Sequence, residues 1–206
     1  MLELFIAPGT CALASHIALE EVGAPHKLHP VSFANKEQSS REFLRLNPKG
    51  RVPVLVTPDG ILTETPAILA YIAQSFPDAG LAPLNDVFEF ARVQSFNSYL
   101  CSTVHVSHAH RMRGHRWTDD PDAIEALRKK VPETVAAGFA HIEADLFAGP
   151  YVMGEQYTIA DPYLFTLAQW MPGDSVDPAQ FPKIAAHGRL MRSRPAVARA
   201  LAAEQL

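Results

Sequence analysis

The sequence predicts an α/β unit followed by an all-α unit. Strand-type segments occur only before residue 63, a stretch rich in Pro, Gly and Ala follows at 78–86, and helical periodicity dominates the rest. With 206 residues and 48% hydrophobic composition, the chain can bury a sizeable core. We therefore expect a first domain over 1–77, a linker over 78–86 and a helical domain over 87–206.

The first two elements follow from a short apolar run and a helical stripe. Residues 2–6 (LELFI) end at Pro8-Gly9, which predicts a strand and a turn. Thr10 is suited to cap the helix that follows, which ends before Gly23. Its apolar stripe consists of Leu13, Ile17 and Val22.

The rest of this unit alternates in the same way. The sequence predicts a strand over 26–33, a short helix over 42–46, a strand over 52–56, a turn at 58–60, a fourth strand at 61–62 and a helix up to residue 76. Thr65 followed by Pro66 is typical of an N-cap with proline at the first helical position. The order β-α-β-α-β-β-α results.

The second unit is predicted from helical patterns alone. They cover 87–112, 122–147, 159–171, 182–190 and 196–203. Pro132 should kink or split the second of these helices, because proline lacks the amide hydrogen. Thr158 and Asp161 have capping-box spacing, with the hydroxyl of Thr158 accepting from the Asp161 amide and the carboxylate accepting from the Thr158 amide.

Charge and cysteine content limit the possible partners. The formal net charge is -4, so neither nucleic acid nor an anionic membrane is an expected partner, and a small ligand is the better expectation. The first 21 residues lack a signal-peptide pattern, and no stretch is long enough to span a bilayer. Cys11 and Cys101 are too few for a disulfide framework, which favours a cytoplasmic location.

Five segments together resemble the bacterial beta class of glutathione transferases. They are PGTCALASHIAL, NPKGRVPVL, LTETPAILAYIA, VH at 104–105 and YTIADPYLFTLAQW. The resemblance implies a thioredoxin-like domain that binds glutathione, a helical-bundle domain, a role in detoxification and a homodimer. It also implies that glutathione is a co-substrate and that no metal is needed.

Three residues are candidates for the chemistry at the glutathione sulfur. Cys11 lies one residue inside the predicted first helix, where the helix end favours a thiolate. The resemblance implies that Cys11 faces glutathione, although a small buried cysteine is the plain alternative. Thr10 competes with it as a hydroxyl donor, and His105 matches the histidine that the beta class brings from the helical domain.

The resemblance also implies which residues hold glutathione. Val52, before a cis Pro53, would bind the cysteinyl backbone, and Glu64 and Thr65 would bind the γ-glutamyl end. Lys36, or alternatively Lys49 or Arg51, would pair with the glycyl carboxylate. Ser98, which stands where relatives of the family have an asparagine, is also a candidate for glutathione binding. The second-substrate pocket is expected to contain Phe5, Ala7, Pro8, His108, Arg111, Met112, Trp117 and Trp170.

The chain departs from the family at two positions on the helix of His105. Relatives have asparagine seven residues before the histidine, where this chain has Ser98 beside Asn97, and commonly lysine after it, where this chain has Val106. These two departures predict weaker polar contacts from that helix to glutathione. No tyrosine stands near the first strand, where Phe5 and Ile6 are found, so tyrosine-type thiol activation is excluded there.

The expected reaction is glutathione chemistry of one of two kinds. Glutathione thiolate would attack a hydrophobic electrophile, or Cys11 would carry out glutathione-dependent thiol-disulfide exchange. One alternative is a non-catalytic binding or interaction module on the same scaffold. Another is a metal site on one helix face, formed by Cys101, His105, His108 and Met112 at i, i+4, i+7 and i+11.

Overall fold

The computed structural model describes all 206 residues, and its first unit is built on a four-stranded mixed sheet. The strands are β1 (Leu2–Ile6), β2 (His26–Pro30), β3 (Val54–Thr57) and β4 (Gly60–Thr63), in the order β2-β1-β3-β4. β1 runs parallel to β2 and antiparallel to β3, and β3 forms a hairpin with β4. The predicted third strand begins two residues late, because Pro53 cannot donate to a ladder.

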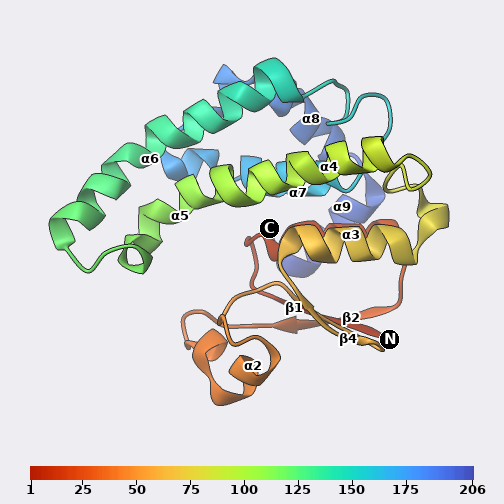
Figure 1. Cartoon of the computed structure of the whole chain (residues 1–206), viewed down its shortest axis with the longest axis horizontal. Coiled ribbons are helices and arrows are strands. Elements are labelled where there is room, and N and C mark those ends of the chain that lie inside the picture. Colours follow the sequence, from red (N-terminus) through yellow and green to blue (C-terminus); the bar gives the residue numbers. More distant parts are fainter.

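Helices cover both faces of this sheet, in the thioredoxin-like arrangement (Figure 1). α1 (Ala12–Glu21) packs against α3 (Thr65–Ser75), whereas α2 (Arg41–Leu46) lies on the other side of the sheet from α3. Leu4 and Leu55 of the sheet are fully buried. Ile68, Leu69 and Ile72 on one face of α3 are also fully buried and complete this part of the core.

The rest of the chain is helical. Its helices are α4 (Val87–Tyr99), α5 (His105–Arg113), α6 (Pro121–His141), α7 (Ala160–Ala168), α8 (Pro182–Arg192) and α9 (Pro195–Glu204). One π-helical turn, Leu100–Val104, joins α4 to α5 without a break, as the continuous pattern over 87–112 predicts. None of the helices is both long enough and apolar enough to cross a membrane.

The two units are packed together along α1. Both α7 and α9 contact this helix, and one large hydrophobic cluster contains residues from the sheet and from the helical unit. Leu19 of α1 and Leu164 of α7 both belong to that cluster and are fully buried. One continuous core therefore holds the two units in a fixed relation to each other.

Pro132 does not split the helix in which it lies. α6 runs without interruption through it to His141, so of the two predicted effects, a kink or a split, the split does not occur (Figure 1). Val131 and Val135 of α6 are buried on either side of Pro132. Tertiary packing of this face therefore outweighs the loss of one helical hydrogen bond.

Three helices start differently in the structure from the way the sequence predicts. α1 begins at Ala12, so Cys11 is the N-cap residue and not an internal one. α3 begins at Thr65, and Glu64 is its N-cap, with a positive φ of 74° that is rare outside glycine. In α7, the Asp161 carboxylate accepts from the Thr158 amide at 2.7 Å as predicted, but the Thr158 hydroxyl accepts from the amide of Ala160 at 3.3 Å.

Candidate active site

A cleft of about 520 Å³ lies between the α/β unit and α5. It combines thiol, imidazole, hydroxyl and carboxylate groups, and it gathers most of the residues that the sequence singled out. The predicted residues that line it are Thr10, Cys11, Arg51, Val52, Pro53, Glu64, Thr65, His105, His108, Arg111, Met112, Trp117 and Trp170.

The Cys11 thiol lines the cleft and is buried, and its raised pKa keeps it protonated at neutral pH. Its Sγ donates to the Val52 carbonyl at 3.6 Å, next to the cis peptide bond between Val52 and Pro53. Burial raises the pKa of Cys11 to about 11, against smaller lowering contributions from Thr65 and Arg113. The expectation of a thiolate at the helix end is therefore wrong, because desolvation outweighs the helix-end field.

Thr10 stands at the entrance to α1, one residue before the thiol. Its hydroxyl donates to the Ala7 carbonyl at 2.7 Å and accepts from the Ala12 amide at 3.4 Å. These two contacts hold the loop that presents Cys11 to the cleft. A ligand can receive the hydroxyl proton of Thr10 only if the bond to Ala7 is exchanged.

His105 projects from the first turn of α5 into the cleft. Burial, and after it the nearby positive charges of Arg113 and Arg51, together lower the pKa of His105 to about 4. The imidazole is consequently neutral at pH 7. Its ring lies 5.1 Å from the ring of Trp170, edge to face. A neutral imidazole in this position can donate one hydrogen bond and accept another.

The start of α3 forms the second polar end of the cleft. Thr65 is buried at the first helical turn, where backbone amides lack helical partners. The Glu64 carboxylate is exposed and pairs with the ammonium of Lys49, which also donates to Thr63 Oγ1 at 2.7 Å. This end therefore offers amide donors beside a carboxylate that accepts a cation.

The aromatic wall of the cleft is fixed by a buried carboxylate. His108 stacks on Trp170 at 4.3 Å, and its Nδ1 is 2.7 Å from the Asp174 carboxylate, which is 2% exposed. Arg111 lies 3.4 Å from the same carboxylate. A Cβ atom at Gly173 would come within 2.3 Å of Arg111 Nη1, so this backbone must approach the guanidinium closely.

Several cleft residues were missed by the sequence reasoning. Among them are Gln38, Asn47, Arg113, Arg116 and Tyr163. The signal for the arginines was the basic segment RMRGHRW at 111–117, within a chain of net charge -4. Tyr163 lies within the helix predicted over 159–171, and its local pattern does not mark it as a cleft residue. Burial raises the pKa of Tyr163 above its ordinary value, so this phenol stays neutral.

Some predicted residues lie outside the cleft. Phe5 stacks on His29 at 4.5 Å and packs against Phe43, so it belongs to the sheet surface and α2. Lys36 and Ser98 are exposed away from the cleft lining. Ala7 and Pro8 do not line it either. The neighbour of Ser98, Asn97, is fully buried in α4.

The structure does not assemble the metal set predicted on the helix of His105. Met112 is 74% exposed, and Nδ1 of His108 is engaged by Asp174. Cys101 and His105 do not join a third His, Cys, Asp or Glu within reach of a shared ion. The helical spacing of the four residues thus reflects one wall of the cleft.

Comparison with known proteins agrees with the fold. The family model for the glutathione S-transferase N-terminal domain matches residues 1–74, and that for the C-terminal domain matches residues 121–203. Glutathione S-transferase GstA of Escherichia coli O157:H7 is 34% identical over 100% of both chains. Glutathione S-transferase GST-4.5 of Xanthomonas campestris is 28% identical over 100% of both chains.

Solved structures give the same result. A glutathione transferase homologue from Sulfitobacter with bound glutathione is 45% identical, with a TM-score of 0.97 over 100% of this chain and 99% of the other. The bacterial beta class glutathione S-transferase of Sphingomonas chungbukensis is 34% identical, with a TM-score of 0.85 over 98% of each chain. From its two domains and the relatives that match its full length, the chain belongs to the glutathione S-transferase family.

Proposed function

We propose that this protein is a glutathione transferase that presents glutathione thiolate to an electrophile in the cleft. The observation that carries this proposal is the pairing of the Cys11 thiol with the Val52 carbonyl at 3.6 Å, in a cleft that also holds neutral His105. A thiol, a strand-edge carbonyl and an imidazole at one place suit a ligand with its own thiol. Bound glutathione in the Sulfitobacter homologue supports the choice of ligand.

Glutathione would lie extended from α3 to Arg51. Its α-carboxylate would accept hydrogen bonds from amides at the start of α3 beside Thr65. Its ammonium would pair with the Glu64 carboxylate, which already binds one cation, the ammonium of Lys49. Its cysteinyl backbone would pair with Val52. Its glycyl carboxylate would pair with Arg51, which forms no ion pair within the protein and replaces Lys36 as the better candidate.

Cys11 and His105 would then stabilise the glutathione sulfur. A backbone amide of glutathione on the Val52 carbonyl would free the Cys11 S–H to donate to the thiolate. His105, neutral at pH 7, would donate a second hydrogen bond, and the thiol proton would leave to solvent. The sulfur lone pair would attack the electrophilic carbon, forming the S–C bond as the leaving group departs with its electron pair.

Thiol-disulfide exchange through Cys11 is the second candidate. Its position in the cleft favours this reaction, because a mixed disulfide with glutathione would lie where the sulfurs meet. A pKa of about 11 disfavours it at neutral pH, since only the thiolate attacks. Conjugation is therefore the better supported reaction, with Cys11 acting as a donor.

The remaining arginines indicate an acidic second substrate. Arg113 and Arg116 line the cleft without any carboxylate partner, and burial together with Arg51 and Arg113 lowers the pKa of Arg116. Glutathione has two carboxylates, and the proposed binding mode assigns them to α3 and Arg51. Arg113 and Arg116 are then left for an anionic group on the electrophile, beside the aromatic ring of Trp117.

Calorimetric titration of reduced glutathione into metal-free protein tests the core of this proposal. We expect binding at micromolar to millimolar concentration, weakened about tenfold or more by Glu64→Gln, which keeps the backbone but removes the charge. Arg189→Ala, an exposed change on α8, is the control and should bind as the parent does. No binding at millimolar glutathione would leave only a non-catalytic module on this scaffold.

A pair of electrophiles tests the acidic specificity. The kcat/KM of a carboxylate-bearing electrophile should exceed that of its methyl ester, and the double variant Arg113→Ala, Arg116→Ala should lower only the former, by about 10-fold to 100-fold. Equal loss for acid and ester would instead assign the two arginines to glutathione or to folding.

A further inference from the structure

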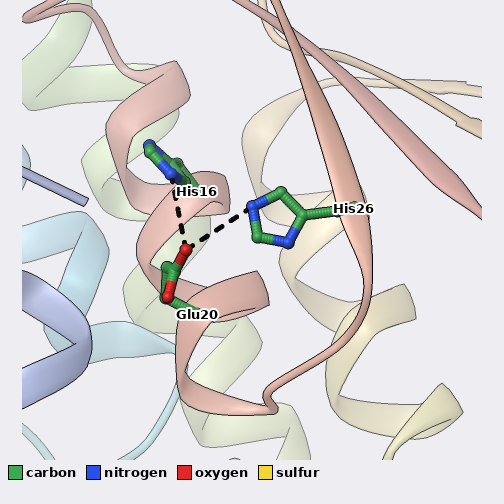
Figure 2. Close-up of side chains that lie close together, drawn as sticks. All are labelled: His16, Glu20 and His26. Carbon is green, nitrogen blue, oxygen red and sulfur yellow. Dashed lines mark ion pairs between the residues drawn. The ribbon is translucent and has the colours of Figure 1, made fainter. Parts of the chain in front are cut away.

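A second cluster of reactive side chains lies on the half of α1 that is remote from Cys11. His16 and Glu20 are one helical turn apart on α1, and His26 opens β2. Their nearest ligand atoms all lie within 4.8 Å of one another. Figure 2 shows the Glu20 carboxylate between the two imidazole rings. None of the three residues lines the glutathione cleft.

Both imidazoles are oriented with Nε2 toward Glu20. Nδ1 of His16 lies 2.9 Å from Glu204 Oε1, and Nδ1 of His26 lies 2.8 Å from the Ala24 carbonyl oxygen. Both partners only accept hydrogen bonds, so each Nδ1 carries the proton and each Nε2 presents a lone pair in the neutral ring. A carboxylate or carbonyl behind the ring is the usual support of a metal-binding histidine.

The imidazole of His16 is otherwise unexplained. Its side chain is 0% exposed, and Nε2 has no hydrogen-bond partner. A buried polar atom without a partner is costly and uncommon. It is aimed at Glu20 Oε1, 4.0 Å away, which is too far for a hydrogen bond.

The spacing suits an ion between the ligands better than a direct bond. Glu20 Oε1 is 3.7 Å from His26 Nε2 and 4.0 Å from His16 Nε2. Two ligand atoms at zinc distances in a tetrahedral site lie about 3.3 Å apart. The two Nε2 atoms lie within 4.8 Å of each other, so a shift of up to about 1 Å in each imidazole would close the site. The other oxygen of Glu20 is held by Arg199, which leaves Oε1 for the ion.

From these observations we propose that His16, Glu20 and His26 form a zinc site. Two imidazole nitrogens and one carboxylate oxygen suit a borderline divalent ion such as Zn²⁺, and Cys and Met are not involved. The side chains of Glu20 and His26 are 20% and 10% exposed, so the fourth position faces solvent and takes water. The metal joins α1 to β2 and, through Glu204 and Arg199, to α9.

The site also touches the loop that carries the catalytic thiol. Glu204 binds His16 with one oxygen and accepts from the Gly9 amide at 3.2 Å with the other. Gly9 lies two residues before Cys11, and its carbonyl accepts from the indole of Trp170 at 2.9 Å. Zinc on His16 therefore stabilises the Glu204 contact that holds this loop. The expected effect is on stability, and it does not depend on the proposed transferase activity.

Zinc alone is the probe in the test. Metal-free protein is dialysed against Zn²⁺ with a competing chromophoric chelator, and bound metal is counted by mass spectrometry. We expect one ion per chain, and an unfolding temperature roughly 5 °C higher when zinc is about 100-fold above its Kd. Co²⁺ in its place should give the visible absorption of a tetrahedral site.

Two variants and one control decide where the ion binds. His26→Gln and Glu20→Gln, at partly exposed positions, should each weaken zinc binding about 100-fold while circular dichroism stays unchanged. His29→Gln changes the other histidine of β2, which pairs with Glu3, and should bind zinc as the parent does. The proposal is overturned if no zinc binds at 100-fold molar excess, or if both site variants retain the parent affinity.

Discussion

At the residue scale, the Cys11 thiol is subject to two opposing influences. The helix end and Arg113 favour the thiolate, whereas burial under Val52 favours the neutral thiol. Desolvation is the larger influence, and it raises the pKa of Cys11 to about 11. At pH 7 the thiolate is then about one part in ten thousand. A cysteine in this state acts as a hydrogen-bond donor and is slow as a nucleophile.

The first prediction concerns the reactivity of Cys11. In a Cys101→Ser background, alkylation of Cys11 by iodoacetamide should accelerate about tenfold per pH unit from pH 7 to 10, because the thiolate fraction rises tenfold per unit below the pKa. Mass spectrometry of the modified peptide measures the rate. A plateau below pH 8 would mean that the thiol is activated after all. The Cys11→Ala protein is the control for background labelling.

The second prediction concerns His105 and acid stability. Its folded pKa of about 4 is below the ordinary 6.5, so between pH 6.5 and 4 the unfolded chain binds more protons than the folded one. This difference makes the free energy of unfolding fall as the pH drops, by about 2 kcal/mol between pH 7 and 5.

Urea unfolding at pH 7 and pH 5 measures this contribution. His105→Gln should lose less stability between the two pH values than the parent, by about 2 kcal/mol. His115→Gln removes an exposed histidine and should keep the parent difference. If His105→Gln shows the full acid loss, the imidazole is not held neutral by the fold.

At the element scale, the start of α7 depends on one buried carboxylate. Asp161 accepts from the amides of Val152 and Thr158 at 2.8 and 2.7 Å and lies 3.0 Å from His187 Nε2. It thereby ties α7 to the loop before it and to α8. Since Asp161 and His187 are both almost completely buried, no water replaces a lost partner.

The third prediction follows from this network. Asp161→Ala should lower the free energy of unfolding by about 3–5 kcal/mol, because four buried donors, the Thr158 hydroxyl included, lose their acceptor. Urea denaturation gives the change. Asp145→Ala, which removes an exposed carboxylate paired with His141, should cost about 0.5 kcal/mol or less. Comparable losses for the two variants would show that the network contributes little.

Local patterns predict the elements of this chain well. The four strands and the α1 and α3 helices follow from short apolar runs, turn residues and helical stripes, which depend only on neighbouring residues. Pro132 is the exception. Its effect depends on how firmly Val131 and Val135 are packed, which no local pattern contains.

The cleft could be predicted only in part. Matching segments located Cys11, Val52 and Glu64, because those positions are set by the fold. The sequence could not show that burial suppresses ionisation of the Cys11 thiol. Nor could it show that Arg113 and Arg116 line the cleft, because both features depend on tertiary placement. The zinc ligands escaped notice for the same reason: His16 and His26 come from different elements.

At the scale of the whole molecule, the start of α4 exposes an apolar surface. Val87 and Phe88, at the start of α4, are 86% and 72% exposed. Beside them is a hollow of about 320 Å³, lined by Gln74, Leu84, Val87 and Phe90. A projecting ring next to an apolar hollow is self-complementary under a two-fold axis, because each copy can insert Phe88 into the hollow of the other.

The fourth prediction is that this surface mediates a homodimer, as the family resemblance implies. Sedimentation velocity at micromolar concentration should show a dimer, and Phe88→Ser should raise its dissociation constant at least tenfold, because the interface loses an apolar anchor. Leu206→Ser, which changes another exposed apolar residue, should leave the dimer intact. A parent protein that sediments only as a monomer would count against the dimer. A dimer unaffected by Phe88→Ser would locate its interface on another face.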